Sequence, residues 1–94
     1  METQRHFEIE SEKARREAAQ IRTMLVDLNR IVEILASDIA TEEERSRVSD
    51  RSDPAYPILA RTLAERRDNL KFTIAALEQR LEKILAALPE AVAA

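Results

Sequence analysis

Residues 21–39 of the chain read IRTMLVDLNRIVEILASDI. Apolar residues recur in this segment at alternating steps of four and three positions: Ile21, Leu25, Leu28, Val32, Leu35 and Ile39. These steps form a heptad repeat, the spacing with which one α-helix packs lengthwise against another. The segment therefore predicts the central part of a long helix with a second helix along one seam.

The predicted helix covers about residues 5–46, because no proline or glycine interrupts that range. Its seam continues toward the N-terminus through Ala18, Ala14 and Phe7. At 1.5 Å per residue such a helix is about 60 Å long. A helix of this kind is rarely stable alone in water, so its apolar seam requires a partner.

A polar break follows the first helix. Residues 46–53 are rich in serine and aspartate, which favour turns because their side chains bond to nearby backbone groups. We therefore expect a loop over residues 47–53. Asp53 and Pro54 have the residue types of a helix N-cap and a first helical position.

The second helix is predicted over about residues 54–88. Pro57 lacks a backbone N–H and disfavours helical angles at Tyr56, so the start is placed between residues 53 and 57. Pro89 ends the helix, and residues 89–94 are expected to form a loose tail. Residues 1–94 are thus predicted to be one helical-hairpin domain.

The second helix has its own heptad seam. Its members are Ala60, Leu63, Arg67, Leu70, Ile74, Leu77, Leu81, Ile84 and Leu88. An antiparallel pairing in which residue numbers add to 98 aligns the two seams and brings Glu17 near Arg80 and Arg22 near Glu78. The sequence therefore predicts an all-α fold, an antiparallel two-helix hairpin that resembles a coiled coil.

Several apolar residues lie outside these seams. They form a candidate interaction surface: Met24, Ile31, Ile34, Leu59 and Phe72. Small domains without disulfides or metal commonly compensate for a thin core by oligomerising. We therefore expect a homo-oligomer, a C2 dimer of hairpins that closes into a four-helix bundle.

Composition restricts the classes of function. The net charge is −3, with both signs interspersed, which argues against a nucleic-acid-binding surface. No apolar run reaches the roughly 18 residues that a membrane span requires, and the first residues have no apolar signal-peptide region. We therefore expect a cytoplasmic protein that does not bind a membrane.

The sequence offers little for chemistry. His6 is the single histidine, and Glu10 one turn later makes at most a two-ligand site. The chain has no cysteine and therefore no thiol chemistry. We predict no catalytic residue, no metal site and no cofactor.

Arg67 occupies an a position of the second seam, where an apolar residue is expected. Positions three and four residues away on its own helix carry no acid. Its partner is therefore expected from the first helix, a second subunit, water or a ligand. Either its stem packs while its head reaches a carboxylate, or it forms an anion site with Arg66 and Lys71.

The leading prediction is a non-enzymatic helical module for protein–protein interaction: an adaptor, a scaffold or a small chaperone-like subunit. Such a module binds by placing a helix in a groove or by completing a bundle. One alternative is a small all-helical enzyme or anion-binding bundle centred on Arg67. A second alternative is a coiled coil associated with nucleic acid.

Overall fold

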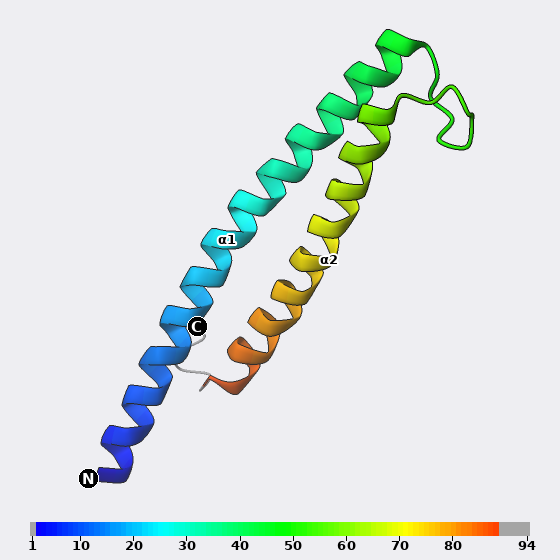
Figure 1. Ribbon diagram of the computed structural model, residues 1–94. Helices are drawn as coiled ribbons and strands as arrows, with labels where there is room; N and C mark the ends of the chain where they lie inside the picture. The colour runs from blue at the N-terminus through cyan, green and yellow to red at the C-terminus, as the bar shows by residue number, and fades with distance from the viewer. Residues whose placement is uncertain (1, 89–94) are drawn as a thin grey trace. The chain divides into compact units, whose positions relative to one another are not determined.

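The computed structural model describes residues 2–88. It contains two helices, α1 (Glu2–Ser46) and α2 (Ile58–Ala87), which pack against each other (Figure 1). The two helices make up 86% of the described residues, which contain no strand. The all-α prediction and the pairing of two helices are therefore confirmed.

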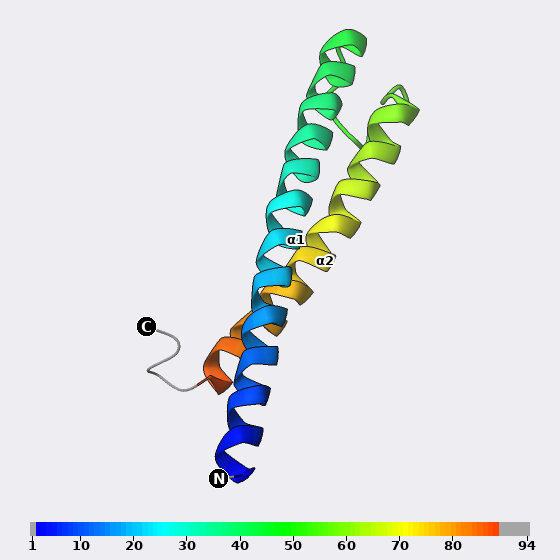
Figure 2. The same ribbon diagram turned by 90° about the vertical axis from the view of Figure 1, so that its left-hand side faces the viewer.

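The chain divides into two compact units. The loop unit is Asp27–Ile74, and the terminal unit combines residues 2–26 with residues 75–88 of the described chain. In the loop unit, the end of α1 and the start of α2 lie side by side and run in opposite directions (Figures 1 and 2).

The loop unit contains a compact apolar cluster. Ile39, Tyr56, Ala60 and Ala64 are all buried, and Val48 and Leu63 pack against them. The two alanines let α1 approach α2 closely, since a small side chain occupies little space between the helix axes. The heptad pattern predicted neither the burial of Tyr56, which precedes the helix, nor that of Ala64, which lies beside the seam.

The terminal unit buries less. Its buried apolar residues are Ala18 and Ile21, while the other predicted seam positions from Ser11 onwards are half-buried. The predicted extension of the seam to Phe7 is wrong, because this side chain is 57% exposed. The register pairs Phe7 with position 91, which is outside the described residues.

Helix α1 ends in a turn without glycine. Arg47 has a φ of 61°, in the left-handed region that glycine usually occupies after a helix. Ser46 supports the turn through its hydroxyl group. That oxygen accepts a hydrogen bond from the Val48 N–H at 3.2 Å and donates one to the Glu43 carbonyl oxygen at 3.2 Å.

Helix α2 begins at Ile58, one residue after the predicted range of 53–57. Asp53 caps a turn instead of the helix: its carboxylate accepts the Ala55 N–H at 2.8 Å. The helical hydrogen bonds begin with the Arg61 N–H, which donates to the Pro57 carbonyl oxygen at 3.1 Å. Pro57 thus fixes the boundary, since its ring disfavours a helical residue before it.

The other boundaries differ slightly from the predictions. Helix α1 begins at Glu2 rather than near residue 5, and its end at Ser46 agrees with the expected position. The loop is residues 47–57 instead of 47–53, and α2 ends at Ala87, one residue before the predicted end. The predicted loose tail lies outside the described residues.

Candidate functional site: an apolar flank and a polar loop cluster

The five residues of the candidate interaction surface are all exposed, by 41% to 76%. They are Met24, Ile31, Ile34, Leu59 and Phe72. Four more large apolar side chains are also exposed, although none was assigned to this surface from the sequence: Phe7, Ile9, Val26 and Ile58. Phe7 was placed in the seam instead. Helical spacing puts Ile58 away from the seam, and this signal could have identified it.

The candidate residues in the loop unit occupy two faces of the hairpin. With 3.6 residues per turn, α1 has a flank on each side of its seam. Ile31 and Ile34 lie on one flank, and Glu43 lies toward the other. Leu59 lies on the corresponding flank of α2. Phe72 is about 140° around α2 from Leu59 and therefore lies on the back of that helix, near the direction of Ile58.

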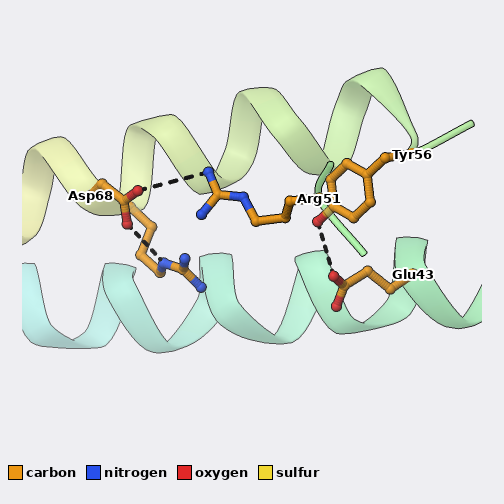
Figure 3. A network of polar contacts seen from close by, with 5 residues as sticks. Glu43, Arg51, Tyr56 and Asp68 are labelled. Atoms are coloured by element: carbon orange, nitrogen blue, oxygen red, sulfur yellow. Dashed lines mark hydrogen bonds and ion pairs between the residues drawn. The ribbon is translucent and has the colours of Figure 1, made fainter. Parts of the chain in front are cut away.

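The opposite flank carries a polar cluster that involves the loop (Figure 3). The Tyr56 hydroxyl donates a hydrogen bond to Glu43 Oε2 at 2.9 Å. Arg51 Nη2 lies 3.9 Å from Asp68 Oδ2, so the loop contacts α2 as well as α1. We call Glu43, Arg51, Tyr56, Arg61 and Asp68 the loop cluster.

Arg61, which belongs to α2, contacts the loop through its guanidinium group. Its guanidinium carbon lies 5.5 Å from the centre of the Tyr56 ring, a cation–π distance. Its Nη2 donates to the Arg51 carbonyl oxygen at 3.0 Å. Burial raises the pKa of Tyr56, the hydrogen bond and charge of Glu43 raise it further, and Arg51 and Arg61 oppose the change. The loop cluster therefore favours a protonated tyrosine.

A second turn within the loop holds Asp50. Its Oδ1 accepts the Ser52 hydroxyl at 2.7 Å and the Ser52 N–H at 2.9 Å. These two hydrogen bonds, the side-chain one first, lower the pKa of Asp50. The carboxylate therefore stays ionised and fixes the part of the loop that precedes Tyr56.

Arg67 is half-buried, with 24% of its side chain exposed, and its Nε lies 3.4 Å from Asp68 Oδ1. The expectation that its partner lies off its own helix is therefore wrong. The rule of three or four residues applies to side chains that point outward, whereas a long arginine at a helix contact can bend to the next residue. Asp68 thus contacts both Arg67 and Arg51.

The other two residues of the proposed anion site differ from Arg67 in burial. Arg66 and Lys71 are exposed. Among the described residues, no charged side chain is buried and no buried polar side-chain atom lacks a hydrogen bond. Arg67 is therefore half-buried and paired with a carboxylate, rather than a fully buried charge without a partner.

His6 and Glu10 are exposed on α1. Within residues 2–88, no group of three or more His, Cys, Asp or Glu side chains is placed to hold a metal ion. Neither helix in that range combines the length and the apolar character of a membrane span.

Shallow hollows open on the surface of the described residues, among them one in each unit. One lies along α2 in the loop unit and is lined by Thr62, Glu65, Arg66, Asn69, Leu70 and Thr73. The other lies in the terminal unit and is lined by Phe7, Glu10, Ser11, Ala14, Ala87 and Leu88. Both are open to solvent and resemble contact surfaces more than enclosed ligand sites.

Comparison of the chain with protein-family models, curated proteins and solved structures gave no match.

Proposed function

We propose that this chain is a helical protein–protein interaction module that assembles as a homodimer. One observation carries the proposal: nine large apolar side chains are exposed in the described residues, whereas five are buried. The buried ones are Ile21, Leu35, Ile39, Tyr56 and Ile74. An isolated hairpin thus leaves more large apolar side chains in water than it fully buries, which is unfavourable for a monomer.

The energetic benefit of assembly is large relative to the stability of a small domain. Burying one exposed isoleucine or leucine contributes about 1.5–3 kcal/mol. Ile31, Ile34 and Leu59 lie on one flank of the hairpin, so one contact removes all three from water. A second copy provides this contact and closes a four-helix bundle, the usual way in which amphipathic helices complete a core.

The back of α2 remains available in such a dimer. Ile58 and Phe72 are exposed there and lie about 40° apart around the helix. An amphipathic helix of another protein can pack against this strip, which is the role of an adaptor, scaffold or chaperone-like subunit.

We rank the anion-binding or enzymatic bundle second. Arg67 already contacts Asp68, and Asp68 also contacts Arg51, so the guanidinium has a carboxylate within the chain. Association with nucleic acid ranks third, because the net charge is −3.

Analytical ultracentrifugation of the chain and of an Ile31→Glu/Ile34→Glu double variant tests the proposal. We expect a dimer for the natural chain and a monomer for the variant, because charges on the flank oppose its burial. Val26→Glu is the matched control: Val26 is 60% exposed on the same helix but about 140° around it from Ile31. A monomeric natural chain at micromolar concentration, or equal loss of assembly in the control, contradicts the proposal.

A further inference from the structure

The exposed flank of α1 in the loop unit has acids at both ends of its apolar centre. Asp27, Ile31, Ile34 and Asp38 follow one another at steps of four, three and four, so they lie on one side of the helix. All four side chains are exposed. Within residues 2–88, neither aspartate forms an ion pair.

The corresponding flank of α2 carries a base. Arg66 lies in the hollow between Thr62 and Leu70, beside Leu59 on the same side of the helix. Its guanidinium forms no ion pair in the described part of the chain. Glu65 also lines the hollow, but it lies farther from the seam around α2.

The spacing on α1 excludes one way of joining two copies. The order Asp, Ile, Ile, Asp at steps of four, three and four is the same in both directions. If α1 packed antiparallel on α1 of a second copy, Asp27 would therefore lie opposite Asp38. Like charges that face each other across an interface are unfavourable. Packing α1 on α2 of the second copy instead places the acidic flank against the flank with Arg66.

We propose that two copies associate with α1 of each against α2 of the other, and that Arg66 pairs with Asp38 of the second copy. The two-fold axis then runs along the helices, and the ion pair occurs twice. This inference rests on the proposed homodimer and specifies which surfaces meet. Its occupant is a second copy because the flank is complementary to itself in both charge and apolar character.

The lean of the side chains supports the choice of Asp38 over Asp27. In the register in which residue numbers add to 98, Arg66 is level with residue 32. Asp38 is then about 9 Å away along the axis and Asp27 about 7.5 Å, at 1.5 Å per residue. Helical side chains lean toward the N-terminus of their helix, and for Arg66 this direction leads to Asp38.

Charge reversal with reciprocal rescue tests the pairing. In a dimer of the Asp38→Arg variant, arginines face each other at both pairs, and in a dimer of the Arg66→Asp variant, aspartates do. Each substitution is therefore expected to raise the Kd of dimerisation at least tenfold. An equimolar mixture of the two variants restores opposite charges at both pairs and should recover the dimer. Light scattering coupled to size-exclusion chromatography measures each mass, and circular dichroism verifies the helices.

The control variant is Glu33→Arg, which makes the same change of charge on an exposed α1 position on the other side of the seam. It should leave the dimer unchanged. If both reversed variants still form the dimer, or if their mixture stays monomeric, the Arg66–Asp38 pairing is wrong while the homodimer stands. A natural chain that is itself monomeric overturns both proposals.

Discussion

The loop unit and the terminal unit contain the same heptad seam, but they bury it to different extents. In the loop unit Leu35, Ile39 and Ile74 are buried along the seam. In the terminal unit Ala18 and Ile21 are the buried residues, and the leucines beside them are half-exposed. The seam alone therefore does not determine how much apolar surface leaves water.

The difference comes from a third segment. In the loop unit the chain between the helices packs Tyr56 and Val48 against the helix contact, so the core has three sides instead of two. Its polar atoms are bonded to both helices, through Glu43 and Asp68. We therefore expect stability to concentrate in the loop unit, since regions with few buried contacts open more readily.

The largest expected effect compares two isoleucines of similar burial. Ile39 is 5% exposed and Ile21 is 4% exposed, but Ile39 belongs to the buried cluster with Tyr56. Ile39→Ala should lower the free energy of unfolding by about 4 kcal/mol, and Ile21→Ala by about 2 kcal/mol, because surroundings that can relax leave a smaller cavity. Urea denaturation at one protein concentration measures both. Equal losses would show that the loop adds nothing to the core.

The next effect concerns the hydrogen bond between the loop and α1. Tyr56→Phe keeps the buried ring but leaves Glu43 without its donor, and should cost about 1–2 kcal/mol of unfolding free energy. In a Glu43→Ala background the same substitution should cost much less, because the acceptor is already absent. An undiminished cost in that background would mean that the ring environment, not the bond, is responsible.

The same tyrosine should make stability depend on alkaline pH. Its pKa in the folded chain is raised above the ordinary value of 10.0, so the folded state keeps the proton where the unfolded state loses it. This contribution is complete below pH 10 and is lost as the pH rises through the folded-state pKa. The melting temperature should therefore fall more steeply between pH 8 and 11 for the natural chain than for Tyr56→Phe. An equal fall in both proteins would contradict the claim that burial raises the pKa of Tyr56.

The heptad steps predicted what depends on periodicity. They predicted the two helices, the seam positions from Ala14 to Ile39, and the approach of Glu17 to Arg80, whose Nε lies 2.6 Å from Glu17 Oε1. The second predicted pair, Arg22 and Glu78, forms no ion pair in the described part of the chain. Periodicity is a property of helices and carries no information about a loop. For that reason the sequence did not predict the burial of Tyr56.

Two further features escaped prediction for local reasons. The partner of Arg67 is the adjacent Asp68, which a face-by-face count of helical neighbours excludes. The start of α2 at Ile58 lies one residue beyond the predicted range of 53–57, because Asp53 bonds within its own turn and Pro57 disfavours a helical residue before it.

A smaller effect concerns the point where α1 enters the loop. Arg47 has a φ of 61°, which costs a residue with a Cβ about 1 kcal/mol relative to glycine. Arg47→Gly should therefore raise the free energy of unfolding by about 1 kcal/mol. Arg30→Gly, the same change inside α1, should lower it by about 1 kcal/mol. Loss of stability in both variants would show that Arg47 has contacts that outweigh its backbone angle.

The smallest expected effect belongs to the terminal unit, where Glu17 and Arg80 form the polar contact between α1 and α2. Their side chains are 38% and 64% exposed, whereas Tyr56 in the loop unit is 3% exposed. Water and salt screen exposed charges, and ordering two long side chains costs entropy. A double-mutant cycle with Glu17→Ala and Arg80→Ala should therefore give a coupling of about 0.2–1 kcal/mol, smaller than that between Tyr56 and Glu43.

The Glu17–Arg80 coupling should fall further in 0.5 M salt, while the coupling between Glu43 and the neutral tyrosine should change less. If the exposed pair proved the stronger of the two, the terminal unit would be held by charge to an extent that its burial does not indicate, and the concentration of stability in the loop unit would have to be abandoned.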